Sequence, residues 1–422
     1  MKNRKKTILQ MKVAAVLLIS SVSSTAIAAA TTEQPPQSDS LATVFTQGKL
    51  NGNIRSLLFS RDFDAATEDR TTLTIGGNLR FETAPLYGVS AGVGFKTGAG
   101  NNLDDNEVYR GLLALGDTPF DAENYAALDE YYLRYNNWDT DLILGAQQIE
   151  TPWLRAHDIR LTPKKYRGFA VTNNSIEKVA LHGYYIEKWL NWTSEDWESI
   201  TSGITGNLDE NEGALAGGVV WQLSDMFKIQ GWDYYFNEVL NTFYMQAGYD
   251  QEMGEDYSLF ASLKYFNQTD VGDALDGSID TFSAGGNIGL AAYGATLIAY
   301  YGSNGDDALR NPFGGDWIVS MQVNNHERAE EDVWALQLKY NFERLGLKGL
   351  SADVWYGSFN TPDAGNNISP DLDEIDFNLQ YNLVGWFEGC SIRLRYAFID
   401  QDEDVAGGED YSDGRIYLQY KF

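Results

Sequence analysis

The last ten residues, DGRIYLQYKF, alternate between apolar and polar side chains and end on an aromatic residue. Successive side chains of a β-strand point to opposite sides, so Ile416, Leu418, Tyr420 and Phe422 share one face. A strand with one apolar and one charged face fits the sheet of a soluble protein, whose apolar face covers a core. It also fits a membrane barrel, whose apolar face meets lipid and whose polar face meets water. The rest of the chain favours the barrel.

The N-terminus has the composition of a secretory signal peptide. Basic residues precede a short apolar run at 13–19, and Ala26-Ile27-Ala28 is a suitable cleavage site. We therefore predict a signal peptide over 1–28 and a polar periplasmic lead-in over 29–47. The apolar run is too short to cross a bilayer as a helix, and no other run reaches about 18 apolar residues, which excludes a helical membrane protein.

The composition excludes several classes of protein and fits long strands. The 60 acidic residues exceed the 31 Lys and Arg, and a net charge of −29 argues against binding nucleic acid. A single Cys rules out an internal disulfide. Proline, which cannot donate to a strand ladder, is scarce (9), while 25 Tyr and 11 Trp suit two interfacial girdles. A large secreted β-domain is the alternative.

Strand-like segments recur along the chain, and the links between them are of two kinds. We predict about 18 strands, near 49–59, 71–82, 88–97, 127–136, 141–149, 168–173, 178–186, 213–223, 226–236, 242–250, 256–267, 279–290, 293–302, 332–342, 349–359, 374–384, 389–399 and 413–422. Short links such as 83–87, 224–225 and 387–389 are predicted periplasmic turns. Long, acidic, Gly- and Asn-rich links are predicted extracellular loops, at 98–126, 150–167, 187–212, 268–278, 303–331, 360–373 and 400–412. The prediction is an all-β, transmembrane antiparallel β-barrel over 48–422, wide enough for a water-filled lumen.

The alternation also assigns side chains to the lumen. In 88–97, for example, Val89, Val93 and Phe95 share the lipid face, which leaves Lys96 on the inner face. The predicted lumenal basic residues are Arg55, Arg80, Lys96, Arg134, Arg393, Arg395, Arg415 and Lys421. If the first strand pairs with the last, several of them form a ladder down one wall, and basic residues in a pore favour anions. The alternative is that a wet lumen simply tolerates scattered charges.

The segment 150–167 is the predicted constriction loop. Its apolar residues Trp153, Leu154, Ile159 and Leu161 would be buried on the barrel wall if the loop folded inward. Such folding would present its charged residues to the pore. The predicted constriction residues are Trp153, Arg155, His157, Asp158, Arg160, Lys164, Lys165 and Arg167. A loop packed over the rim for stability is the alternative.

Several blocks of sequence resemble the OprD family of outer-membrane porins. They are GNIRSLLFSRDFD (52–64), FETAPLYGVSAGVGFKT (81–97), LGAQQIETPWLRAHDIRLTPKKYRGFAV (144–171), EKVALHGYYIEKW (177–189) and the closing IYLQYKF. ETAPLYG and DIRLTP are the most specific, and the likeness extends over nearly the whole mature chain. The resemblance implies an 18-stranded barrel, inward-folded loops and a basic ladder that guides small carboxylate-bearing solutes such as amino acids.

We therefore predict a porin of the Gram-negative outer membrane, without catalysis, metal or cofactor, that favours small carboxylates. A non-selective porin, a barrel hydrolase and an adhesive barrel are the alternatives. The three histidines, His157, His182 and His326, stand in no recognisable catalytic motif, and GxSxG is absent. Sparse His and a single Cys argue against zinc. The expected partners are outer-membrane lipid, lipopolysaccharide and small carboxylate solutes, and the choice between monomer and homo-oligomer stays open.

Overall fold

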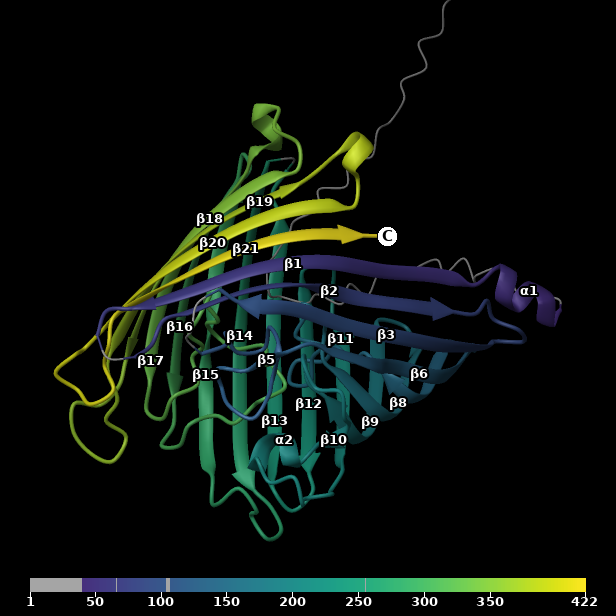
Figure 1. Cartoon of the computed structure of the whole chain (residues 1–422), viewed down its shortest axis with the longest axis horizontal. Helices are drawn as coiled ribbons and strands as arrows, with labels where there is room; N and C mark the ends of the chain where they lie inside the picture. Colours follow the sequence, from purple (N-terminus) through teal and green to yellow (C-terminus); the bar gives the residue numbers. More distant parts are fainter. Residues whose placement is uncertain (1–39, 66, 104–106, 255) are drawn as a thin grey trace, which may run out of the picture. The chain divides into compact units, whose positions relative to one another are not determined.

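The computed structural model describes residues 40–65, 67–103, 107–254 and 256–422. The predicted signal peptide and most of the lead-in lie outside these residues. In the described part of the chain, 18 long antiparallel strands pair in chain order, and β1 (Lys49–Phe63) pairs with β21 (Tyr411–Lys421) to close the barrel (Figure 1). The predicted fold class and strand number are confirmed. No described helix is long and apolar enough to span a membrane.

The remaining barrel strands occupy the positions expected from the alternation. They are β2 (Arg70–Glu82), β3 (Val89–Asn102), β6 (Tyr125–Asn137), β7 (Thr140–Gln147), β8 (Lys165–Ile176), β9 (Val179–Leu190), β11 (Ala214–Gln222), β12 (Phe227–Phe236), β13 (Leu240–Glu252), β14 (Tyr257–Asp270), β15 (Asp280–Ala292), β16 (Ala295–Asn304), β17 (Asp332–Asn341), β18 (Leu350–Asn360), β19 (Leu372–Asn382) and β20 (Cys390–Gln401). The short elements are α1 (Leu41–Thr46), β4 (Ala114–Leu115), β5 (Ala122–Glu123), β10 (Glu198–Ser199), α2 (Ser202–Thr205), η1 (Phe342–Leu345) and η2 (Gly385–Phe387).

Several strand boundaries differ from the sequence-based prediction, for example β1, which ends at Phe63 and not at 59, and β3, which ends at Asn102 and not at 97. Strand β8, predicted over 168–173, begins at Lys165 because its ends pair with β7 and β9. Lys165 and Arg167 therefore belong to a strand and not to the constriction loop. The lead-in contains the short helix α1, which begins after Ser40. The Ser40 hydroxyl caps this helix by accepting a hydrogen bond from the Thr43 amide (3.3 Å).

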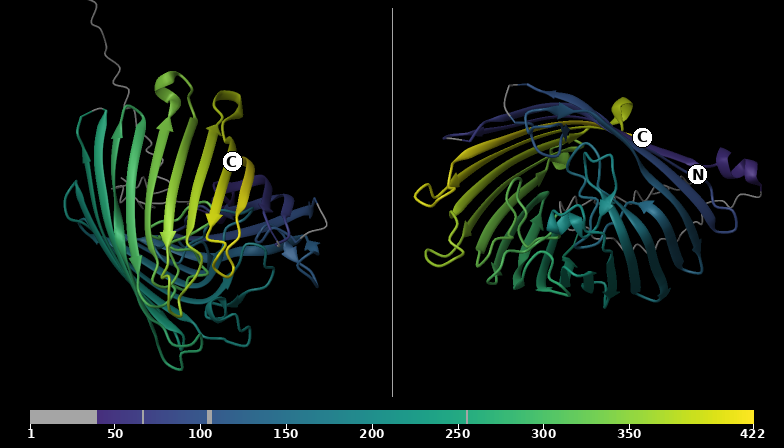
Figure 2. Two further views of the ribbon diagram at one scale, coloured as in Figure 1. Left: turned by 90° about the vertical axis from the view of Figure 1, so that its left-hand side faces the viewer. Right: turned by 60° about the horizontal axis from the view of Figure 1, so that its bottom comes forward.

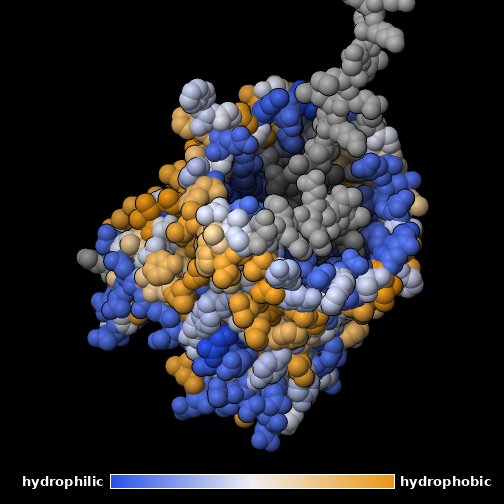
Figure 3. Space-filling model, turned by 90° about the vertical axis from the view of Figure 1, so that its right-hand side faces the viewer, coloured by the Kyte–Doolittle hydropathy of each residue, from blue (hydrophilic) through white to orange (hydrophobic). Residues whose placement is uncertain are grey.

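Exposure alternates along the strands as a lipid-facing barrel requires. In β3, Val93 and Phe95 are 47% and 48% exposed, whereas Lys96 is fully buried. Apolar side chains of this kind form much of the outer surface seen in Figure 3. Leu57 and Phe59 of β1 are completely buried and share the inner face with Arg55.

The lumen is partly filled by extracellular loops rather than open from end to end. Figure 2 shows loop segments inside the ring of strands. One buried cluster joins Leu57 and Phe59 of β1 to Tyr109 and Leu112 of the β3–β6 loop and to Leu161. Burying apolar side chains against an inner wall stabilises the inward position of each loop. These loops and the wall between them form the candidate site.

Candidate functional site

The β7–β8 loop (148–164), which holds most of the predicted constriction residues, crosses the lumen. The Trp153 ring lies 5.0 Å from the rings of both Phe266 on β14 and Trp317. Trp153, Leu154 and Leu161 are fully buried, but Ile159 is 36% exposed, so the prediction of Ile159 as an anchor is wrong. The loop is tied to the β16–β17 loop (305–331) by Asn311, whose amide donates to the Trp153 carbonyl (3.1 Å).

Three carboxylates of the barrel wall hold the tip of the β16–β17 loop. Glu374 accepts from the amides of Val323 (2.8 Å) and Asn324 (3.0 Å). Asp376 accepts from the Gln322 amide (2.7 Å), and Asp413 accepts from the Gln322 side chain (2.9 Å). These three carboxylates were not among the site residues predicted from the sequence. Glu374 and Asp376 alternate with the exposed Ile375 and Phe377, and this alternation could have placed both carboxylates on the inner face.

Predicted ladder residues from β20 and β21 lie side by side on the wall. Arg395 is directly opposite Arg415, and Arg393 is directly opposite Tyr417. Like charges directly opposite each other destabilise a sheet, so counter-ions are required. Arg415 donates to Asp413 (2.6 Å), and Arg395 lies 3.9 Å from Asp376.

Aromatic rings from β1, β21 and the β3–β6 loop organise further arginines around this pair. Tyr109 donates to Asp413 and accepts from Arg61 (3.1 Å) and Arg415 (3.0 Å). The guanidinium carbon of Arg160 lies 5.5 Å from the Phe59 ring centroid. We call Arg160, Arg393, Arg395 and Arg415 the arginine cluster.

Two members of the arginine cluster lack a carboxylate partner. Among the described residues, no carboxylate oxygen lies within 4.0 Å of the side-chain nitrogens of Arg160 or Arg393. Arg393 instead donates to the side-chain oxygen Oδ1 of Asn378 (2.6 Å) and lies over the Tyr417 ring, with 5.8 Å from its guanidinium carbon to the ring centroid. The cluster therefore carries excess positive charge where the loops narrow the lumen.

Arg55 joins the constriction loop to the wall instead of facing the channel freely. It is 5% exposed, pairs with Asp158 through two nitrogens (2.6 Å for Nη2–Oδ2) and donates to the Arg160 carbonyl (2.7 Å). A bidentate pair of this kind fixes geometry as well as charge. Arg55 and Asp158 thus orient the segment that presents Arg160.

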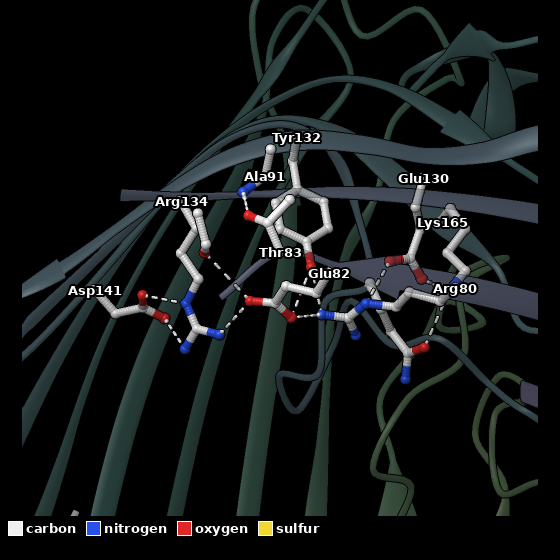
Figure 4. Close-up of polar contacts among 11 residues, drawn as sticks. Arg80, Glu82, Thr83, Ala91, Glu130, Tyr132, Arg134, Asp141 and Lys165 are labelled. Atoms are coloured by element: carbon white, nitrogen blue, oxygen red, sulfur yellow. Dashed lines mark hydrogen bonds and ion pairs between the residues drawn. The ribbon is translucent and has the colours of Figure 1, made fainter. Parts of the chain in front are cut away.

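A second group of predicted ladder residues forms a row of alternating charges on β2, β6, β7 and β8 (Figure 4). Glu82 lies between Arg80 (2.6 Å) and Arg134 (3.3 Å). The row continues from Arg134 to Asp141 (2.6 Å) at one end, and from Arg80 through Glu130 (3.2 Å) to Lys165 at the other. We call these residues the alternating row. Its carboxylates offset its cations, so its net charge is small.

Three other predicted site residues lie in different places: one is buried, one is outside the lumen and one is exposed at the end of a strand. The ammonium of Lys96 is fully buried and donates to the carbonyls of Asn191 (2.6 Å) and Trp192 (3.1 Å), so a solute in the channel does not meet it. Arg167 pairs with the half-exposed Glu187 beside the outward-facing Phe169, which places it outside the lumen. Lys421 is exposed at the end of β21, on the same side as Arg415.

The remaining constriction residues lie in or beside the loop interior. Arg155 lies 3.6 Å from Glu150, while Lys164 is buried against the β16–β17 loop. His157 is half-buried, and burial together with the neighbouring Lys164 and Arg160 holds its pKa far below the usual value. His326 is fully buried, which lowers its pKa to about 4. No group of three or more metal-binding side chains occurs among the described residues.

The alternating row gives a first prediction. Glu82→Gln should raise the anion-over-cation permeability ratio about fivefold, because it removes one unit charge beside Arg80 and Arg134, worth about 1 kcal/mol at 4 Å in water. The measurement is the reversal potential of single channels under a salt gradient. Glu187→Gln, on the outer face, is the matched control and should leave the ratio unchanged. An unchanged ratio in Glu82→Gln would show that the row does not face the ion path.

The comparisons with known proteins agree with this architecture. The family model described as "outer membrane porin, OprD family" matches residues 45–422. This chain belongs to the OprD family of outer-membrane porins. It is therefore a channel protein of the Gram-negative outer membrane, as the sequence resemblance indicated.

This OprD-family chain resembles one curated relative in sequence and several solved structures in fold, all at low identity. It is 25% identical over 286 residues to the porin-like protein GalP of Pseudomonas putida, covering 67% of this chain and 68% of GalP. The solved structure of Pseudomonas aeruginosa OccK9 (OpdG) is similar with a TM-score of 0.80 and 23% identity, over 90% of this chain and 99% of OccK9. Acinetobacter baumannii OccAB3 has a TM-score of 0.80 at 18% identity, over 89% and 99%.

Proposed function

We propose that this porin passes small hydrophilic solutes by diffusion and favours those that carry a carboxylate. The observation that carries the proposal is the arginine cluster, in which Arg395 faces Arg415 directly and two further guanidiniums lack a carboxylate partner among the described residues. A carboxylate accepts two parallel hydrogen bonds from a guanidinium, which makes it the natural ligand for such a cluster. P. aeruginosa OpdK, 23% identical to this chain with a TM-score of 0.79, was solved with vanillate, itself a carboxylate.

The proposed route begins among the extracellular loops and follows the wall. A solute carboxylate would exchange between Arg160, Arg393 and Arg395, each of which offers several N–H donors. Contacts must stay weak for flux to continue. No energy source or cofactor enters this scheme. Residues 1–28 would serve as the export signal, 29–47 as the periplasmic lead-in, and lipid with lipopolysaccharide would surround the barrel.

Planar-bilayer recording of the refolded porin tests this proposal. We expect discrete conductance steps, anion preference under a salt gradient, and brief blockages by propionate or amino acids but not by neutral sugars. A general porin is the second candidate, favoured by the alternating row, whose charges cancel over much of the wall. Equal effects of sugars and carboxylates on the current would establish that alternative.

A further inference from the structure

A cavity of about 490 Å³ lies where three extracellular loops meet, next to Arg160 of the arginine cluster. The guanidinium carbon of Arg160 lies 5.1 Å from the centroid of the Trp192 ring, which lines the cavity. The β7–β8 loop, the β9–β11 loop (191–213) and the β16–β17 loop contribute to it, together with the end of β9. Its walls include the rings of Trp189, Trp192 and Trp317, and its polar lining includes Lys164 and Glu198. None of the four arginines of the cluster lines it.

Two polar atoms in the lining are buried without a hydrogen-bond partner among the described residues. They are Nε1 of Trp189, a residue only 5% exposed, and Nδ1 of His157. Neighbouring groups are satisfied: Trp192 donates its Nε1 proton to the His157 carbonyl (2.9 Å). Buried polar groups without partners are rare in folded proteins because each one costs free energy. Two of them in the lining of one cavity indicate a ligand that supplies acceptors.

The third feature is a buried cation without a counter-ion. Lys164 is 2% exposed, and its ammonium lies 4.0 Å from the Trp192 ring centroid and donates to the Pro312 carbonyl. No carboxylate oxygen of the described residues lies within 4.0 Å of it. Burial, with a smaller contribution from Arg160, lowers the pKa of Lys164 to about 7. A bound anion would stabilise the charged form.

We propose that this cavity is a capture site for monocarboxylates, in which the ligand carboxylate accepts hydrogen bonds from Lys164 and from Nε1 of Trp189. His157 supplies a further donor in the tautomer that carries its proton on Nδ1. The inference rests on the proposed function, since it gives carboxylates a first binding step among the extracellular loops before the arginine cluster. The site raises the local concentration of the solute beside the constriction.

Glu198 makes the site selective among carboxylates. Its side chain lines the same cavity, and no basic nitrogen of the described residues lies within 4.0 Å of its carboxylate. A second carboxylate on the ligand would meet this like charge in a partly desolvated space. Monocarboxylates such as propionate are therefore favoured over dicarboxylates such as succinate.

The test is direct binding of propionate to the purified porin, measured by ligand-observed NMR. Trp189→Phe keeps an aromatic ring but removes the orphan N–H, and it should weaken binding about tenfold, the usual effect of one hydrogen bond to a charged group. Because that N–H has no partner among the described residues, its loss costs the fold no hydrogen bond, and any fall in melting temperature should reflect only the smaller buried ring. Lys164→Met should abolish binding, whereas Lys178→Met, the same change in an exposed periplasmic turn, should have no effect.

The pH dependence gives a second readout. Propionate binds the ammonium form of Lys164, so its dissociation constant should rise as pH increases through about 7. The charged or titratable neighbours of Lys164 are Arg160, whose pKa burial lowers only to about 10, and His157, whose pKa lies far below this range. Glu198 lines the same cavity. The rise in the dissociation constant of propionate near pH 7 should persist in Glu198→Gln and be absent in Lys164→Met. Glu198→Gln should also improve succinate binding.

The outcomes separate this inference from the proposed function. If propionate blocks the wild-type pore but binds Trp189→Phe and Lys164→Met as tightly as wild type, the capture site is wrong and the carboxylate channel stands. If propionate neither binds nor blocks the wild type, both proposals fail. Succinate that binds wild type as tightly as propionate overturns the selectivity for monocarboxylates.

Discussion

Replacing Arg393 and Arg395 together by glutamate should abolish the anion preference of the channel and weaken carboxylate block at least tenfold. The change converts two guanidiniums of the arginine cluster into carboxylates, a difference of four unit charges in the narrowed lumen. Each lost hydrogen bond to a charged group is worth about 1.5–3 kcal/mol. The measurements are the reversal potential under a salt gradient and the blocking constant of propionate.

The double variant should still fold, which makes the result interpretable. The carboxylate introduced at position 395 would lie directly opposite Arg415 and form a cross-strand pair of opposite charge, although it would also approach Asp376. The neutral variant Arg393→Gln with Arg395→Gln is the matched control and should give intermediate selectivity. Heat-modifiable gel mobility would report barrel formation for each variant. Wild-type selectivity in the folded glutamate variant would remove the arginine cluster from the proposed mechanism.

The alternation of the sequence was sufficient to predict the barrel because lipid and water impose opposite demands on neighbouring residues. Phe95 and Lys96 illustrate this: one is half exposed on the outer face and the other is buried inside. The same rule fails where a strand is irregular. The register of β3 with β6 shifts beside Phe95, and this leaves Asp129 and Glu130 both buried although they are adjacent in sequence.

The candidate site was less predictable because its chemistry depends on contacts between distant segments. The sequence placed Arg80 and Arg134 in the lumen but did not show that Glu82, Glu130 and Asp141 lie close enough to offset them. Likewise, the inward direction of Lys96 does not reveal that carbonyls from the β9–β11 loop surround its ammonium. Period-two patterns give the face of a residue, whereas its partners depend on register and on loop conformation.

Apolar contacts between the inner wall and the extracellular loops explain how a wide barrel encloses a narrow passage. The loops cover side chains of the inner wall that would otherwise meet water. Leu57 and Phe59 on β1 are fully buried against Tyr109, Leu112 and Leu161. An apolar inner face is costly in an empty lumen and favourable under a loop. Removing a side chain that anchors a loop should therefore lower the stability of the protein and raise the conductance of the channel.

Trp153→Ala should release the β7–β8 loop from the wall and increase single-channel conductance several-fold. Trp153 is fully buried between Phe266 and Trp317, and truncating a buried Trp to Ala typically costs about 3–5 kcal/mol. The strands do not depend on this contact, so the barrel should persist while the loop loses its anchor. Anion selectivity should fall as well, because Arg160 is presented by the same loop.

Bilayer recording and thermal unfolding measure the two effects on one protein preparation. Trp138→Ala is the control, since Trp138 is 77% exposed in a periplasmic turn and its loss should change neither property by a measurable amount. A Trp153→Ala channel with lower stability but wild-type conductance would mean that the loop stays inside the lumen through its other contacts, such as the hydrogen bonds of Arg55 to Asp158 and to the Arg160 carbonyl. Wild-type stability and conductance together would show that Trp153 is not the anchor of the constriction.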